Sequence, residues 1–170
     1  MAFLDLVRSR SSVRAFQLTP VEADKVTQVL EAARLAPSAA NRQPWQFIVI
    51  TDAKRREAMK AAYDREWFWK APVIIAACLD TAACWKRQGD GKSYGDVDVA
   101  IAFDHLTLAA AELGLGTCWI GAFNPVEARR LLELPAGVEP IALTPLGYPA
   151  GEAKPRSRKG LNEIVKWERF

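Results

Sequence analysis

Three arginines and two serines stand close together near the N-terminus, in a pattern suited to binding a phosphate. The cluster consists of Arg8, Arg10, Ser11, Ser12 and Arg14. Guanidinium groups and hydroxyls hold phosphate oxygens through charge-assisted hydrogen bonds. Short basic runs are also common in solvated surface loops, so the cluster by itself leaves an anion site and a plain basic loop as alternatives.

A second basic cluster lies near the C-terminus, in the segment K-P-R-S-R-K at 154–159. A disordered tail is one interpretation, but apolar segments on both sides suggest that the cluster is pinned at each end. The first 20 residues hold three basic residues and one acid, and residues 150–170 hold six and three. Positive charge is therefore concentrated at the chain ends, which fits a small anionic ligand better than a nucleic acid, whose binders usually carry an extended basic surface.

Two further segments have the composition of ligand-binding loops. The first is P-S-A-A-N-R-Q-P-W at 37–45, in which prolines stiffen the chain and the amides of Asn41 and Gln43 offer donors and acceptors for a flat heterocycle. The second is G-L-G-T-C-W-I-G at 114–121, whose glycines permit a close approach of backbone to ligand. An ordinary turn is the alternative for the first segment. For the second, which follows a helix and is no dinucleotide fingerprint, the alternative is a helix end before a core strand.

The side chains of most hydrolytic and metal sites are missing. The single histidine, His105, lies in an apolar helical segment, and Cys78, Cys84 and Cys118 lack the spacing of metal ligands. No C-x-x-C, P-loop or H-E-x-x-H motif is present. We therefore expect no metal and no catalytic side chain, and a protein that takes its chemistry from a bound cofactor.

Composition narrows the class of protein. A chain of 170 residues with 50% hydrophobic and 25% charged residues is typical of one globular domain. The N-terminus M-A-F-L-D-L-V-R-S-R does not resemble a signal peptide, and no apolar stretch is long enough to predict a membrane span. An odd number of cysteines suggests reduced thiols. We expect a cytoplasmic protein that binds neither membranes nor nucleic acids.

Hydrophobic periodicity and turn residues predict alternating helices and strands. The segment T-P-V-E at 19–22 has the pattern of a capped helix start, with Thr19 as the cap. Gly114 is expected to end the longest helix, and Pro145 to place the end of its strand at a sheet edge or a bend. Helices are expected at 2–9, from 19–22 to before Pro37, and at 52–64, 96–113 and 124–134, and strands at 46–51, 72–79, 117–121, 140–146 and 161–165.

The helical segment 96–113 is apolar nearly all round. A helix of this kind is buried on more than one side. Its second buried face is either wrapped by its own chain or part of a subunit interface, and the pattern alone does not separate these alternatives.

In their order and spacing, these segments together resemble the nitroreductase family of FMN-dependent oxidoreductases. The resemblance implies an α+β fold, in which helices flank a mostly antiparallel sheet, and an intertwined homodimer with FMN at the interface. It favours the interface interpretation of helix 96–113. Residues 1–170 then form one FMN-binding domain, whose tail, 151–170, extends onto the partner subunit. The matching segments lie between about Phe3 and Trp167: R-S-S-V-R at 10–14, A-P-S-A-A-N-R-Q-P-W at 36–45, D-V-A-I-A at 98–102, L-G-L-G-T-C-W-I-G at 113–121, L-G-Y-P at 146–149 and K-P-R-S-R at 154–158.

The resemblance also implies cofactor-binding roles for individual residues. Arg10, Ser11 and Ser12 are expected to hold the phosphate and the ribityl chain. Arg14 is expected near the pyrimidine end of the flavin, where a fixed cation favours the reduced anion.

Other parts of the chain are expected to complete the flavin site. Ile120 and Gly121 bring backbone amides to the flavin, with the amide of Ile120 or of its neighbour near N5. Arg156 and Arg158 return to the phosphate, and which of Lys154, Arg156 and Arg158 contacts it stays open. The partner subunit is expected to contribute flavin-lining residues, namely Pro37, Ser38, Ala39 and Asn41, with Gln43 in the same region.

The sequence departs from the family pattern in two places. Many members carry an asparagine and a lysine that reach the flavin before the second strand, and the segment 63–70 cannot be matched to them. The segment 78–94 is short where larger members have a helical excursion over the substrate pocket, so whether a lid covers the pocket stays open. Four aromatic side chains either shape a substrate pocket or pack in the core: Trp45, Trp67, Trp69 and Phe123.

The resemblance implies an NAD(P)H-dependent oxidoreductase that reduces nitro, quinone or other electron-poor substrates. Its ping-pong mechanism passes hydride through flavin N5. The sequence selects neither the oxidant nor one of NADH and NADPH. The alternatives are another reaction on the same fold, such as dehalogenation, enoyl or diketopiperazine oxidation or flavin breakdown, and a non-catalytic flavin-binding protein.

Overall fold

A four-stranded antiparallel sheet forms the centre of the molecule. The computed structural model describes residues 2–151 and 156–170. The strands lie in the spatial order β1-β2-β4-β3, and their ladders are antiparallel, as the resemblance predicted. Their bounds are β1 (Trp45–Ile50), β2 (Val73–Asp80), β3 (Gly116–Thr117) and β4 (Val138–Gly147).

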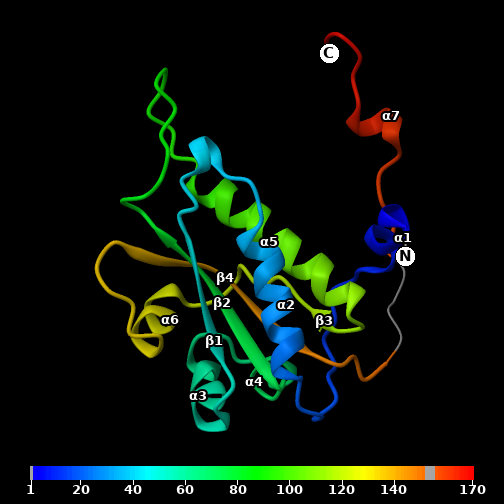
Figure 1. The fold of residues 1–170 in the computed structure, drawn as a ribbon, viewed down its shortest axis with the longest axis vertical. Coiled ribbons are helices and arrows are strands. Elements are labelled where there is room, and N and C mark those ends of the chain that lie inside the picture. Colours follow the sequence, from blue (N-terminus) through cyan, green and yellow to red (C-terminus); the bar gives the residue numbers. More distant parts are fainter. Residues whose placement is uncertain (1, 152–155) are drawn as a thin grey trace.

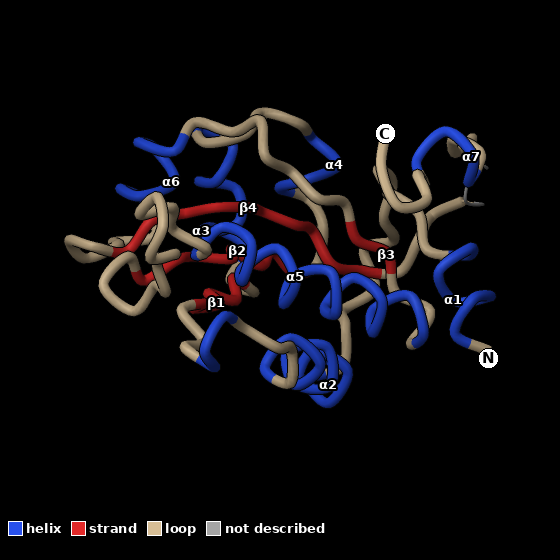
Figure 2. Tube along the Cα trace, turned by 90° about the horizontal axis from the view of Figure 1, so that it is seen from above, coloured by secondary structure: helices blue, strands red, loops and turns tan. Residues whose placement is uncertain are grey.

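Helices cover both faces of the sheet (Figures 1 and 2). One face carries α2 (Ala23–Arg34) and α5 (Gly95–Glu112). The other carries α3 (Ala53–Ala58), the 3-10 turn η2 (Met59–Ala61), α4 (Glu66–Trp69) and α6 (Pro125–Leu131). No helix of the described residues is both long and apolar enough to cross a membrane.

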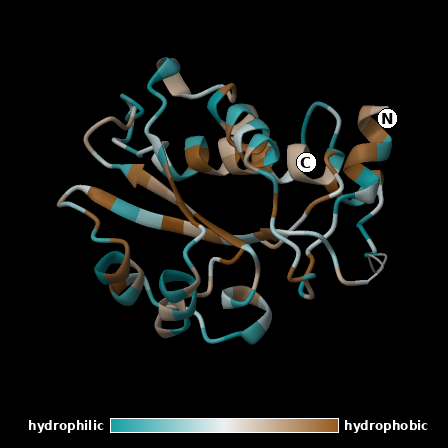
Figure 3. Ribbon diagram, turned by 60° about the horizontal axis from the view of Figure 1, so that its bottom comes forward, coloured by the Kyte–Doolittle hydropathy of each residue, from teal (hydrophilic) through white to brown (hydrophobic). Residues whose placement is uncertain are grey.

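Strand β2 separates two hydrophobic cores. Alternate residues from Val73 to Leu79 pack with α2 and α5, whereas Ile74, Ala76 and Cys78 pack on the opposite face. A strand covered on both faces needs apolar residues at every position, which explains the unbroken hydrophobic run of this segment. Figure 3 shows this hydrophobicity along the sheet and along α5.

Three predicted helices show features expected from the sequence. In α2, Val29 and Ala33 are buried, and Val26 and Leu30 pack beside them, which confirms the predicted apolar face. Helix α5 is followed by Gly114, whose φ of +74° is the left-handed conformation of a helix end. Asn124 caps α6, since its side chain accepts hydrogen bonds from the amides of Val126 and Glu127.

The predicted start of α2 at 19–22 is wrong, because the helix begins at Ala23 and has no side-chain cap. Glu22 has extended backbone and holds Tyr148 instead, accepting a hydrogen bond of 2.6 Å from its hydroxyl. Val21 packs against the core of α2 and α5. A contact with a distant part of the chain therefore displaces the helix start from the position that its local sequence favours.

The strand predicted at 161–165 is also wrong, since these residues form the one-turn helix α7 (Leu161–Ile164). The strand at 117–121 is shorter than predicted: only Gly116–Thr117 is a strand, and Ile120 adds an isolated bridge to Leu143. The helices predicted at 52–64 and 124–134 end earlier, at Ala58 before η2 and at Leu131.

Of the two outcomes expected for Pro145, a sheet edge or a bend, the sheet edge is not found, because β4 lies between β2 and β3. Leu143 and Ile120 exchange hydrogen bonds of 2.9 and 3.0 Å. Since amides alternate along a strand, the nitrogen of Pro145 faces the same side as that of Leu143. On that side of β4, the amide of Cys118 donates to the Thr144 hydroxyl at 3.1 Å. The backbone pairing between β4 and residues 116–120 is therefore interrupted at Pro145, which has no amide hydrogen to donate.

Both ends of the chain expose large apolar side chains. Helix α1 (Phe3–Ser9) forms as predicted, and Phe3, Leu4 and Val7 lie exposed on it. In Figure 1 the segment 156–170 stands away from the sheet and its helices, and all of its residues are exposed. The large apolar side chains of this segment are Leu161, Ile164, Val165, Trp167 and Phe170.

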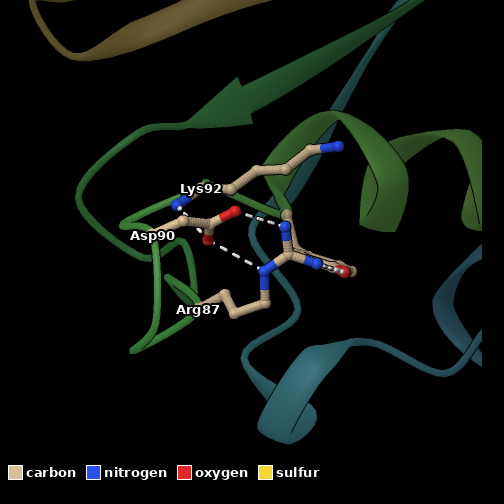
Figure 4. Close-up of polar contacts among 4 residues, drawn as sticks. Arg87, Asp90 and Lys92 are labelled. Carbon is tan, nitrogen blue, oxygen red and sulfur yellow. Dashed lines mark hydrogen bonds and ion pairs between the residues drawn. The ribbon is translucent and has the colours of Figure 1, made fainter.

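The polar segment before α5 is an ordered hairpin. Lys86 and Ser93 form a bridge at its base. Near its tip the Arg87 guanidinium pairs with the Asp90 carboxylate, and Lys92 lies beside them (Figure 4). The same guanidinium donates a 3.1 Å hydrogen bond to the Tyr94 hydroxyl. The short connection between β2 and α5 is therefore held by its own contacts.

Candidate functional site

Three separate parts of the chain enclose a cavity of about 590 Å³, which we call the arginine cavity. Residues 9–15 form one wall, residues from the end of α5 to β3 form another, and the segment after β4 closes it. Its lining residues are Ser9, Arg10, Ser11, Ser12, Val13, Arg14, Ala15, Ala111, Gly114, Leu115, Thr117, Pro149, Gly151 and Arg156.

Hydrogen bonds attach segment 10–17 to both neighbouring walls. The Val13 amide donates to the Thr117 carbonyl at 2.8 Å, and the Gln17 amide donates to the Tyr148 carbonyl at 2.9 Å. Gly116 permits the first contact, because a Cβ at this position would lie 2.7 Å from the Val13 side chain. The basic segment is thus held along its backbone, while its polar side chains line the cavity.

The arginine cavity has a donor set suited to a phosphate. Arg10, Arg14 and Arg156 line it together with the hydroxyls of Ser11 and Ser12. Among the ion pairs of the described residues, none involves these three guanidinium groups. Arginines without carboxylate partners attract a small anion, and they bind phosphate oxygens through several donors each. The structure brings the two basic ends of the chain to one place.

The charge of this cluster acts on the buried thiol of Cys118. Burial raises the pKa of Cys118, and Arg14, a hydrogen bond from Ser12 and Arg10 oppose that rise. Cations near a thiol lower its pKa because they stabilise the thiolate. The positive charge of the arginine cavity therefore acts on a buried residue directly after β3.

The loop at 37–43 is located at the opposite end of α5. Its 3-10 turn η1 (Ala39–Asn41) is tied to that helix by the Ala39 amide, which donates to Asp98 Oδ1 at 2.8 Å. Within the loop, the Gln43 amide donates to the Ser38 hydroxyl at 2.8 Å, and the Gln43 side chain donates to Asn41. The polar groups expected to read a heterocycle thus bond to one another in the single chain.

Helix α5 separates this loop from the arginine cavity. Asp98 holds the loop at one end of the helix, and Ala111 lines the cavity at the other. At 1.5 Å per residue, these positions are about 20 Å apart along the helix axis. Figure 1 shows η1 (light blue) and β3 at opposite ends of α5. Within one chain, the two predicted groups of flavin-binding residues do not meet.

The remaining predicted cofactor-binding residues lie outside the lining of the arginine cavity. The Ile120 amide donates to the Leu143 carbonyl at 2.9 Å. Of the two candidate amides for the flavin, Ile120 is therefore used in this bridge and Gly121 is not. Arg158 is exposed and donates to the Ser157 carbonyl. Of the three C-terminal candidates, Arg156 lines the cavity, whereas Lys154 lies outside the described residues.

The four aromatic candidates for a substrate pocket pack against the two cores. Trp45 packs with α2 and α5, and Trp67, Trp69 and Phe123 pack on the opposite face. Trp67 also lines a second cavity of about 250 Å³, together with Arg14 and Lys70. For Trp45, Trp69 and Phe123 the structure therefore shows core packing, which was the alternative to a role in a substrate pocket.

Several cavity residues were not predicted individually. Gly114, Leu115 and Thr117 belong to the 114–121 segment. Only Ile120 and Gly121 of this segment were predicted to contact the flavin. Pro149 ends the L-G-Y-P motif, and its contact with the cavity follows from the bridge between Phe16 and Pro149. Within the described residues, no group of three or more His, Cys, Asp or Glu side chains is placed to hold a metal ion.

Comparison with known proteins identifies the family. The sequence profile of the nitroreductase family matches residues 7–67 and 58–148. The chain belongs to the nitroreductase family. A nitroreductase family protein of Clostridium difficile 630 is 37% identical, with a TM-score of 0.92, and the similarity covers 100% of both chains.

Named members of the nitroreductase family indicate the kind of chemistry. The NADH dehydrogenase of Thermus thermophilus is 30% identical over 93% of this chain and 92% of its own length. The FMN reductase (NAD(P)H) of Bacillus subtilis is 32% identical over 86% of this chain and 66% of its own length. This nitroreductase-family chain is therefore an oxidoreductase.

Proposed function

We propose that this chain binds FMN through the arginine cavity and catalyses the NAD(P)H-dependent reduction of nitro, quinone or other electron-poor compounds. The observation that carries the proposal is the convergence of Arg10, Arg14 and Arg156 on one cavity, where none of them pairs with a carboxylate of the described residues. The relative named FMN reductase supports this choice of cofactor. A solved structure titled as an FMN-dependent nitroreductase, from Clostridium difficile R20291, supports it as well, with 25% identity and a TM-score of 0.83.

The residues fit a flavin with a phosphomonoester. Two guanidinium groups and two hydroxyls match the charge and the acceptor oxygens of one phosphate, and the third guanidinium group remains for the flavin ring. The cavity volume of about 590 Å³ is in the range of small-molecule and cofactor sites. When bound, FMN supplies the ability to accept and donate hydride.

The protein's own residues anchor and orient the cofactor in this proposal. Arg10 and Arg156 bind the phosphate, and the serine hydroxyls of 11–12 bind the phosphate and ribityl oxygens. Arg14 lies toward the ring and favours negative charge there. Gly121 is exposed, and a Cβ at this position would meet no atom within 4 Å, so its backbone is open to approach by a planar ligand.

We further propose that the functional unit is a homodimer with the flavin between subunits. Helix α5 keeps loop 37–43 about 20 Å from the arginine cavity of its own chain, so a second copy supplies that loop. The exposed apolar side chains of α1 and of the tail 156–170 support an interface, since large exposed apolar patches mark association surfaces. In this arrangement the tail extends onto the partner subunit.

Purification tests the cofactor directly. The protein should be yellow, and the released flavin should be FMN rather than riboflavin or FAD. Anaerobic bleaching by NADH or NADPH is expected of an enzyme, whereas a flavin-storage protein stays yellow. A colourless protein that takes up no added FMN would contradict the proposal.

A second reaction on the same fold is supported by one relative. The 5,6-dimethylbenzimidazole synthase of Rhodospirillum rubrum is 30% identical over 86% of this chain and 82% of its own length. The two activities are separated by the fate of the flavin under oxygen. Intact FMN after many turnovers supports the reductase, and its loss with formation of 5,6-dimethylbenzimidazole supports flavin breakdown.

A further inference from the structure

A buried carboxylate with one unpartnered oxygen lies in the first turns of α5. Asp98 is 1% exposed. Its Oδ1 accepts the Ala39 amide at 2.8 Å, and its Oδ2 has no hydrogen-bond partner among residues 2–151 and 156–170. Burying a carboxylate costs free energy unless its oxygens are bonded. Only one of the two carboxylate oxygens is hydrogen-bonded within this part of the chain, so the role of Asp98 depends on the segment that this hydrogen bond holds in place.

That bond holds a loop with an unusual backbone. Ala40, Asn41 and Gln43 have φ values of +50°, +55° and +50°. For residues other than glycine and asparagine, the left-handed region is strained because Cβ approaches the following carbonyl oxygen. Such a conformation persists only where surrounding contacts determine it. Here the contacts are the Asp98–Ala39 bond at the base and the Ser38–Gln43 bond across the loop.

We propose that Asp98 is a positioning residue, which holds loop 38–43 in the conformation that completes the flavin site of the partner subunit. The inference rests on the proposed function, because it assumes an FMN site shared between two chains. Asp98 does not contact the cofactor in this arrangement. It acts through the Ala39 amide, and it acts on the site whose arginine cavity belongs to the other chain.

Conservative and disruptive variants separate this role from a general effect on folding. Asp98→Asn keeps an oxygen that accepts the Ala39 amide, so its dissociation constant for FMN should stay close to that of the wild type. Asp98→Ala removes the acceptor and should weaken FMN binding at least about tenfold, since hydrogen bonds to charged groups are among the stronger ones. If Asp98→Ala folds and binds FMN as the wild type does, the proposal is overturned.

A second variant changes the donor of the hydrogen bond, so that the test does not depend on whether Asp98→Ala folds. Ala39→Pro deletes the donor and leaves the carboxylate in place. Ser38 has extended backbone, as a residue before proline requires, and Ala39 is the first residue of a 3-10 turn, which suits proline. Ala39→Pro should weaken FMN binding to about the same degree as Asp98→Ala. Wild-type affinity in this variant would also overturn the proposal.

A mixed dimer gives the decisive result. Chains carrying Asp98→Ala and Arg10→Ala, each with a different affinity tag, are co-expressed, and the heterodimer is isolated through both tags. If loop and cavity come from different chains, one site carries both substitutions and the other carries neither. Half of the FMN sites should then bind with wild-type affinity, although both mutant homodimers bind weakly.

The outcomes distinguish the inference from the function on which it rests. A heterodimer without any wild-type site shows that Asp98 acts within its own chain, which overturns the inference and leaves FMN binding intact. If the wild-type protein itself binds no FMN, the proposed function fails first. A role of Asp98 in folding alone predicts lower thermal stability of the Asp98→Ala homodimer, but no recovery of affinity upon mixing.

Discussion

Replacing Arg10 or Arg156 with alanine should weaken the binding of FMN but not of riboflavin, which lacks the phosphate. Both side chains line the arginine cavity without a carboxylate partner in the described chain. A hydrogen bond to a charged group contributes roughly 1.5–3 kcal/mol. Since Arg10 is half-buried and Arg156 is exposed, solvent screening reduces this value to about 1–2 kcal/mol. The dissociation constant for FMN should therefore rise about 5- to 30-fold for each substitution.

Flavin fluorescence titrations of the apoprotein with both ligands, at one fixed salt concentration, measure the effect. Arg8→Ala is the matched control, because Arg8 lies two residues from Arg10, pairs with Asp5 and does not line the cavity. Arg14→Ala should weaken both ligands if Arg14 lies at the flavin ring. An unchanged ratio of FMN to riboflavin affinity in both Arg10→Ala and Arg156→Ala would refute the phosphate assignment, and so would an equal change in Arg8→Ala.

Three other changes have definite expected outcomes. Gly116→Ala places a Cβ 2.7 Å from the Val13 side chain and should lower the free energy of unfolding in urea by about 1–3 kcal/mol, whereas Gly121→Ala, where no atom lies within 4 Å, should not. Burial raises the pKa of Cys78 to about 11. Because the unfolded thiol ionises near pH 9, the wild type should lose stability relative to Cys78→Ala as the pH rises from 9 to 11, and equal pH slopes in chemical denaturation would contradict this. A chain that ends at Gly160 lacks the exposed apolar groups of the tail and should sediment as a monomer with reduced FMN content; an FMN-loaded dimer would argue against the proposed role of the tail.

Features governed by local sequence were predictable. The apolar run of β2, the cap at Asn124 and the glycine after α5 each depend on neighbouring residues, and each forms as expected. The arginine and serine segment at 10–14 was also identified from residue types alone. The structure adds its partners: it joins the segment to residues 114–117 and to Arg156, which are far away in the sequence.

Features governed by distant contacts were not predictable. Glu22 does not help to cap α2, because it accepts a hydrogen bond from Tyr148, which lies 126 residues later. The segment 161–165 contains β-branched residues but pairs with no strand of the described residues, and it forms a helical turn. The alanine at position 40 gives no local indication of its positive φ, which is maintained by a loop bonded to Asp98.

Apart from residues 9–15, the described residues that line the arginine cavity lie between Ala111 and Thr117 or after β4, at Pro149, Gly151 and Arg156, and none comes from the stretch 16–110. The opposite end of α5 carries loop 38–43 and the hairpin at 85–94, whose contacts are largely internal. Evolution can therefore vary the hairpin without disturbing the anchor for the phosphate. The same separation suits engineering: libraries confined to the hairpin tip at 87–92 change neither a cavity-lining residue nor a core residue of the described chain, so cofactor retention should stay constant.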